Sequence, residues 1–188
     1  MTNVFRPWRG IALALAFTLG LAVPASAQDP ARLLLPNLDA LAKRAADTVD
    51  VTLDAALLQL AAGFMTGGDA DEAAVRDLLR GLKGIYVKSY EFDVDGAYSP
   101  ADLDGVRTQL GRGSWTRLVT VTSSKERSSS EVYAWVDQGV TGGLAIISAE
   151  PRELTIVNIV GRIDLERLRQ LEGQFGIPRV PLGGERKD

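Results

Sequence analysis

The last two apolar runs before residue 164 predict a pair of strands, and the spacing beyond them predicts a helix. Residues 144–147 and 154–160 are mostly aliphatic or β-branched, and residues 150–153 predict a reversal between them. The second run is apolar toward both faces, which is typical of an interior strand. Asn158 interrupts it, and its amide must find hydrogen-bond partners if it is buried. Asp164 is expected to cap a helix that lays one apolar stripe back on the sheet, formed by Leu165, Leu168 and Leu171.

Alternation and helical spacing predict the elements that come before this unit. A first helix is expected at residues 36–46, and further helices are expected to begin near residues 54, 69 to 71, and 99, with Asp54 and Ser99 as caps. Strands are expected at residues 48–53, 85–92, 115–122 and 131–136. Four consecutive strands with short turns must be antiparallel neighbours, and the helices need a common face on which to bury their stripes. The sequence therefore predicts an α+β fold, a two-layer sandwich in which helices pack on one face of a mainly antiparallel sheet of about six strands.

The N-terminal 27 residues have the pattern of a cleavable secretory signal peptide. Arg6 and Arg9 precede an uninterrupted apolar run over residues 11–23, and small residues follow up to Ala27. The run is shorter than the roughly 20 residues that a membrane-spanning helix needs. We therefore expect cleavage after Ala27, a periplasmic or secreted protein of a Gram-negative bacterium, and no membrane span after cleavage.

The remaining 161 residues are expected to form one domain, at residues 28–175, with a flexible tail at residues 176–188 that is rich in glycine, proline and charge. The signal peptide contains two arginines and no acid, so 19 basic and 24 acidic residues remain and the net charge is −5. An anionic chain without a basic stripe cannot neutralise many phosphates. Nucleic acid is therefore not an expected partner.

The chain contains no histidine and no cysteine, which limits the chemistry that it can perform. The commonest general base, the commonest transition-metal ligands and the thiolate nucleophile are all missing. Asp93 and Asp95 are the acids that a carboxylate-based hydrolase or lyase would use, and residues 93–104 match a calcium loop poorly, because Tyr98 stands where a glycine is wanted. We expect no enzyme activity, no metal and no cofactor.

One set of aromatic residues stands out as a candidate binding surface. Alternation along the strand at residues 85–92 places three aromatic rings and a lysine together, and the strand at residues 131–136 contributes two more rings. If the helices cover the opposite face, these rings lie half-exposed, where side chains with an apolar body and a polar tip favour contacts with proteins or ligands. Ordinary cross-strand pairing explains the same pattern. The candidate surface consists of Tyr86, Lys88, Tyr90, Phe92, Tyr133 and Trp135.

Several segments together resemble a known family. They include residues 49–53 (VDVTL), residues 82–87 (LKGIYV) and residues 158–161 (NIVG). The chain resembles domain of unknown function 4252, a family of uncharacterised bacterial envelope proteins. The resemblance implies a Gram-negative exported protein and brings no catalytic residues with it. Some members are lipoproteins, but this sequence lacks the cysteine that would carry a lipid.

These observations favour an exported, non-catalytic envelope domain that binds a partner protein or an envelope ligand through the aromatic surface. A periplasmic hydrolase or lyase that uses Asp93 and Asp95 is one alternative, and a carrier of a small apolar ligand, with a cavity between sheet and helices, is another. The oligomeric state stays open.

Overall fold

The computed structural model describes residues 28–35, 38–65, 68 and 70–164. The expected signal peptide at residues 1–27, the expected helix after Asp164 and the expected tail at residues 176–188 lie outside the described residues. None of the described helices is long and apolar enough to cross a membrane.

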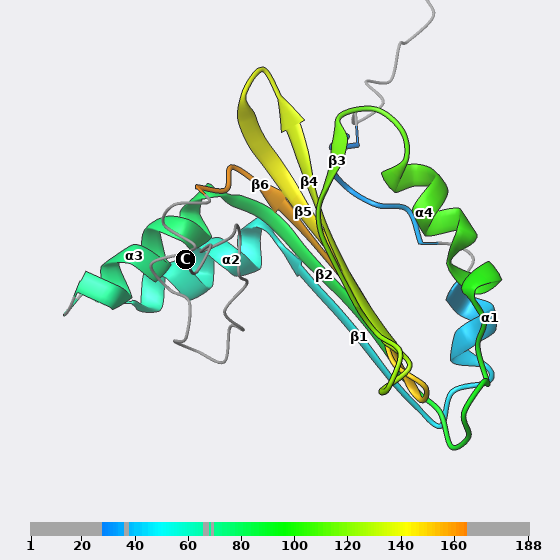
Figure 1. The fold of residues 1–188 in the computed structure, drawn as a ribbon. Helices are drawn as coiled ribbons and strands as arrows, with labels where there is room; N and C mark the ends of the chain where they lie inside the picture. The colour runs from blue at the N-terminus through cyan, green and yellow to red at the C-terminus, as the bar shows by residue number, and fades with distance from the viewer. Residues whose placement is uncertain (1–27, 36–37, 66–67, 69, 165–188) are drawn as a thin grey trace, which may run out of the picture.

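A six-stranded antiparallel sheet organises the molecule (Figure 1). The strands lie in the order β1-β2-β6-β5-β4-β3, so the last four strands along the chain are sequential neighbours, as predicted. The α+β class and the antiparallel six-stranded sheet are confirmed. The strands are β1 (Asp47–Asp54), β2 (Leu82–Glu91), β3 (Trp115–Ser123), β4 (Ser128–Asp137), β5 (Val140–Ala149) and β6 (Glu153–Gly161).

The helices lie on both sides of this sheet and not on one face as predicted, because its central strands are apolar toward both sides (Figure 1). On one side are α1 (Asp39–Ala42), the 3-10 turn η2 (Pro100–Leu103) and α4 (Asp104–Leu110), and on the other are α2 (Ala55–Phe64) and α3 (Ala70–Gly81), near one end of the sheet. We call the two sides the α1/α4 face and the α2/α3 face. The predicted caps are present: Asp54 accepts the Leu57 amide at 2.9 Å, and Ser99 and Asp102 form a capping box around Pro100.

The two faces bury two separate apolar clusters. The larger cluster lies on the α1/α4 face, where strand residues such as Ile147, Leu154 and Ile156 pack with Leu38, Leu41, Leu103, Val106 and Leu110. The smaller cluster lies at one end of the α2/α3 face and contains Leu58, Leu82, Ala134, Leu144 and Ile163. Strands β5 and β6 contribute to both clusters, which is why their sequences are apolar toward both sides.

Asn158 connects the N-terminal segment to the middle of the sheet. Its side-chain oxygen accepts the Leu33 amide at 2.9 Å, and its nitrogen donates to the carbonyls of Ala31 at 3.0 Å and Leu144 at 3.2 Å. The residue is buried, and all of these bonds are internal. The expectation that a buried Asn158 must find partners is confirmed, and its partners fix residues 31–33 across the α1/α4 face.

Candidate functional site

The predicted aromatic surface does not exist as an exposed face. Tyr90, Phe92 and Tyr133 are only 1%, 2% and 7% exposed, because they point into the larger cluster beneath α1 and α4. The prediction was wrong because both faces of β2 and β4 carry apolar residues, so alternation alone does not show which face the helices cover. The three rings are packing residues, so a partner cannot reach them in this structure.

The other three members of the predicted surface are half-buried and do not form one common patch. They are Tyr86, Lys88 and Trp135. The Arg32 guanidinium stacks over the Tyr86 ring at 4.4 Å from its centroid, and Lys88 binds Asp50 at 2.6 Å. The hydrogen bond to Asp50 raises the pKa of Lys88, so the ammonium stays charged. Trp135 pairs with Trp115 on β3. Tyr86 and Lys88 line a depression of about 220 Å³ beside residues 32–35, together with Arg32 and Asp50, which contact them.

A buried charged network lies beneath α4 and was not predicted from the sequence. Glu131 on β4 accepts from Arg107 Nη2 at 2.7 Å and from the Tyr133 hydroxyl at 2.6 Å. Burial alone raises the pKa of Glu131, but these two hydrogen bonds outweigh it, and the pKa lies below its ordinary value. The network therefore keeps the Glu131 carboxylate ionised beneath α4, and Nη2 of Arg107 donates its hydrogen bond to it.

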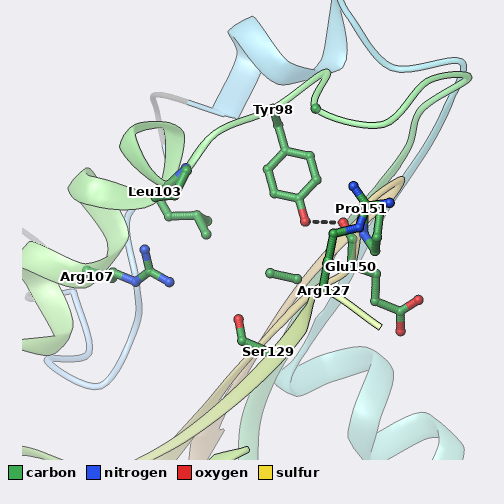
Figure 2. A pocket seen from close by; sticks show the side chains of 10 residues that line it. Tyr98, Leu103, Arg107, Arg127, Ser129, Glu150 and Pro151 are labelled. Carbon is green, nitrogen blue, oxygen red and sulfur yellow. Dashed lines mark hydrogen bonds between the residues drawn. The ribbon is translucent and has the colours of Figure 1, made fainter. Parts of the chain in front are cut away.

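A pocket of about 290 Å³ with a mixed polar and apolar lining lies at one end of the sheet, where three loops meet (Figure 2). Arg107 from α4, Arg127 from the β3–β4 turn and Ser129 from β4 line it, together with Tyr98 and Pro151. The Tyr98 hydroxyl donates to the carbonyl of Glu150 and, at 3.1 Å, to that of Glu153. The pocket wall is thus made from loop contacts that tie the segment after β2 to the β5–β6 turn.

Asp95 is the centre of these loop contacts. Its carboxylate binds Arg152 Nε at 2.7 Å and also binds Arg127. The guanidinium groups of Arg152 and Arg127 hold the pKa of Asp95 below its ordinary value. A carboxylate in this setting is a weak base and stays deprotonated at neutral pH, so it is poorly suited to exchange a proton with a substrate. Among the described residues, no three acidic side chains gather in a way that could hold a metal ion.

Asp93, the second acid of the alternative hydrolase, is exposed and does not line the pocket or the adjoining depression that contains Asp95. Both arginines of the pocket already bind carboxylates, Arg107 to Glu131 and Arg127 to Asp95. The charged groups around the pocket therefore bind one another and hold its loops together.

The outer side of α2 carries the most exposed apolar stripe in the described part of the chain. Leu57, Leu60 and Phe64 are 47%, 57% and 77% exposed, and they recur at the spacing of one helix face. The apolar spacing predicts a packing stripe made of Leu57, Leu58, Leu60, Ala61 and Phe64. Of this set only Leu58 is buried, and the other buried residue of α2 is Ala62. The prediction failed because α2 is apolar nearly all round, so spacing alone cannot say which side faces the sheet.

Comparison with known proteins gives one match. The model of the family described as domain of unknown function DUF4252 matches residues 43–171, which is more than half of the chain. No protein with curated annotation and no solved structure gives a significant match.

Proposed function

The chain belongs to the DUF4252 family, and on this premise we propose that it is an exported, non-catalytic domain of the bacterial envelope that binds a partner protein through the α2 stripe of Leu57, Leu60 and Phe64. The exposure of these three side chains is the observation that carries the proposal. A stripe of this kind, at helical spacing on one helix, is typical of helix-in-groove recognition.

The size of the stripe is sufficient to anchor a protein contact. Burying a fully exposed large aliphatic or aromatic side chain contributes roughly 1.5–3 kcal/mol. Because the three side chains are 47%, 57% and 77% exposed, burying what remains supplies roughly 3–5 kcal/mol before the costs of association. Hot spots of interfaces are commonly a few such residues, surrounded by contacts of little energy.

The charges around the stripe favour a protein over a lipid surface. α2 contains no lysine or arginine, and Asp54 caps its N-terminus. Helices that lie on membranes usually carry basic residues on their polar side, and anionic lipids attract such residues. A chain with a net charge of −5 after loss of residues 1–27 is repelled by that surface. An apolar groove on a partner protein fits α2 better.

The non-catalytic part of the proposal is supported by composition and by the state of the acids. The full sequence has no histidine and no cysteine, and Asp95 is committed to two arginines. A hydrolase that depends on Asp95 would lose all activity in an Asp95→Asn variant. We expect no hydrolytic activity to co-purify with the wild-type protein in the first place.

A carrier of a small apolar ligand is the second candidate, and one feature favours it. A depression of about 270 Å³ lies beside α4 and is lined mainly by Leu34, Leu35, Leu38 and Val106. This volume lies below the roughly 300–1,000 Å³ of common ligand sites. Native mass spectrometry of protein purified from the periplasm tests the candidate, because a retained lipid would appear as an added mass.

The main experiment compares tagged full-length protein, expressed in its own export context, with a Leu60→Glu/Phe64→Glu variant. Val94→Glu is the matched control, because Val94 is 62% exposed in a loop away from α2. After crosslinking in the periplasm, we expect one protein to be enriched with the wild type and the control and lost from the double variant.

Export is tested separately by N-terminal sequencing of the purified protein, which should begin at Gln28 if residues 1–27 are cleaved.

Two results would overturn the proposal. The first is a partner that the double variant retains in full, which would move the binding surface away from α2. The second is a wild-type dimer, detected by light scattering, that the double variant converts to a monomer. In that case the stripe is a contact between copies of this chain.

A further inference from the structure

The pocket at the end of the sheet contains hydrogen-bond donors that the contacts between its loops do not use. An arginine guanidinium carries five N–H donors. Nη2 of Arg107 donates to Glu131 at 2.7 Å. Nη2 of Arg127 donates to Asp95. Within the described part of the chain, the other guanidinium nitrogens of both arginines have no acceptor, and the Ser129 hydroxyl in the pocket wall has no hydrogen-bond partner.

Arg107 is held in position by its bond to Glu131. The Glu131 side chain is only 9% exposed, and its other oxygen accepts from the Tyr133 hydroxyl at 2.6 Å, so the carboxylate is a fixed anchor. Figure 2 shows the Arg107 guanidinium reaching from α4 toward the sheet, where Ser129 lies on β4. The unused donors of Arg107 are therefore preorganised, and preorganised groups bind a ligand at a lower entropic cost.

Arg127 reaches the same pocket from a backbone position that favours glycine. Its φ is +53°, in the left-handed region that side chains rarely adopt. Its side chain is 66% exposed, so its free nitrogens are open to solvent. The β3–β4 turn therefore holds a second cation beside the pocket at some cost in backbone strain, which is typical of residues with a functional role.

The acids near the pocket leave part of this positive charge unbalanced. Asp95 is shared between Arg127 and Arg152. The register of β3 and β4 places Arg117 on the same side of the sheet as Glu131, so this carboxylate also has a second arginine on its side. Glu150 is the acid among the lining residues, and Figure 2 shows its carboxylate directed away from the Arg107 guanidinium.

The remaining walls of the pocket are largely apolar. The Tyr98 ring stacks on Phe92 with the ring centroids 5.3 Å apart, and the Tyr98 hydroxyl is bonded to loop carbonyls, so the ring is fixed. Leu103 and Pro151 lie on either side of it. A molecule in this pocket meets polar donors at one end and a ring with aliphatic side chains at the other, and the volume of about 290 Å³ suits a small ligand.

We propose that this pocket binds a small organic carboxylate, whose oxygens accept from Arg107 and Ser129 and whose apolar body packs against Tyr98. Arginine suits this ligand because its planar donors match the two oxygens of a carboxylate, and Arg127 adds a second positive charge beside it. The site is independent of the α2 stripe, because α2 lies on the other face of the sheet (Figure 1).

Phenylacetate and phenylacetamide are matched probes, because they share a shape and differ in charge. Isotope-labelled protein purified from the periplasm is titrated with each probe and followed by proton–nitrogen correlation spectra. We expect phenylacetate to cause saturable shifts of the Tyr98, Arg107 and Ser129 amides and to bind about tenfold more tightly than phenylacetamide. The amide of Val140, in the turn at the opposite end of the sheet, should not shift.

The variants test the arginines without leaving a buried charge unpaired. Arg107→Gln combined with Glu131→Gln removes both charges of the pair together and should weaken phenylacetate binding about tenfold at unchanged phenylacetamide binding. Ser129→Ala and Arg127→Gln should each weaken it several-fold, and they carry the same comparison if the double variant unfolds. Arg80→Gln is the control, because it removes an exposed cation from α3 and should change neither affinity.

Three results would overturn the proposal. Equal affinities for the two probes would show that the pocket does not select a carboxylate. Phenylacetate binding that all of the pocket variants retain in full would place its site elsewhere on the protein. An absence of saturable shifts at the pocket with either probe would show that it takes no ligand of this class.

Discussion

Asn158 offers the sharpest test of how the fold is held together. It is the buried polar residue of an interior strand, and its amide bonds to the backbone of residues 31 and 33, more than 120 positions away. An Asn158→Ala substitution removes all three hydrogen bonds at once. The change leaves the strand pairing of β6 in place, so it isolates the link between the sheet and the N-terminal segment.

The cost can be estimated in two ways. If residues 31–33 stay docked, the Leu33 amide and the Ala31 carbonyl lose the amide that bonds them, at roughly 1–3 kcal/mol for each buried group. If the segment detaches, water satisfies these groups but the buried side chains of Ala31 and Leu33 become exposed, at roughly 2–4 kcal/mol. The protein takes the cheaper route, so we expect Asn158→Ala to lower the free energy of unfolding by about 2–4 kcal/mol.

An Asn158→Asp substitution adds a dependence on pH. The carboxylate keeps the acceptor for Leu33 but faces the two carbonyls that the amide nitrogen bound, so its folded pKa should lie above the unfolded value of about 3.9. A raised folded pKa means that the relative stability is fully present below the unfolded pKa and is lost as pH rises through the folded pKa. The deficit of Asn158→Asp should therefore grow from about pH 4 upward, while that of Asn158→Ala stays constant.

Urea unfolding followed by the fluorescence of Trp115 and Trp135 measures both variants. Hydrogen exchange then decides between the two routes, because a detached segment would show fast exchange at the Leu33 amide. A loss below about 0.5 kcal/mol for Asn158→Ala, a value typical of surface substitutions, would refute the reasoning that these bonds secure the segment.

Four further outcomes are expected. Glu131→Gln should remove a pH dependence of stability. Burial of Glu131 favours the neutral acid, but the hydrogen bonds from Tyr133 and Arg107 lower its pKa, so the stabilisation is present above the unfolded pKa and is lost as pH falls through the folded pKa. The urea midpoint of the variant should therefore change less with pH below about pH 4.5 than that of the wild type. Gly161→Ala should cost roughly 2–4 kcal/mol in urea unfolding, because φ is +135° and a Cβ atom would lie 2.5 Å from the carbonyl oxygen of the opposing backbone; retention of wild-type stability would contradict this geometry. Gly63→Ala, which has open space in α2, should instead raise the melting temperature by an amount equivalent to about 0.5 kcal/mol. Leu58→Ala should cost about 3 kcal/mol because Leu58 is buried, whereas Leu60→Ala should stay within about 0.5 kcal/mol; similar losses for the two would reverse the assignment of the faces of α2.

Local patterns were sufficient for much of the architecture. The alternation and the turn residues predicted the antiparallel neighbours β3 to β6, and the caps at Asp54 and Ser99 predicted where α2 and the turn before α4 begin. These features depend on residues that are close in the chain, so they can be predicted from the sequence alone. The α1 helix ends at Ala42, short of the expected end at residue 46, and residues 43–46 form a turn and a bend before β1 begins at Asp47.

The candidate site was predicted less well, and the reason is the same at each position. Tyr90 and Tyr133 carry polar hydroxyls, and their strands have apolar residues such as Val87 and Val132 on the other side, so either side fits a core by pattern. α2 poses the same ambiguity, because Leu57 and Leu58 are equally apolar. A residue's own strand or helix sets which residues share its side, but not which side a distant element will cover.

The sequence by itself determined that the chain forms an antiparallel sheet, that Asn158 needs internal partners, and that histidine and cysteine chemistry is excluded. Only the tertiary structure decided which face each side chain occupies. That choice depends on where α1, α4 and residues 31–35 dock, and docking is set by contacts between segments 50 to 125 residues apart, such as Asn158 with Leu33 and Arg44 with Ala97. The apolar area that the fold buries depends on all of these segments together, so the periodicity of one element cannot predict which of its faces is buried.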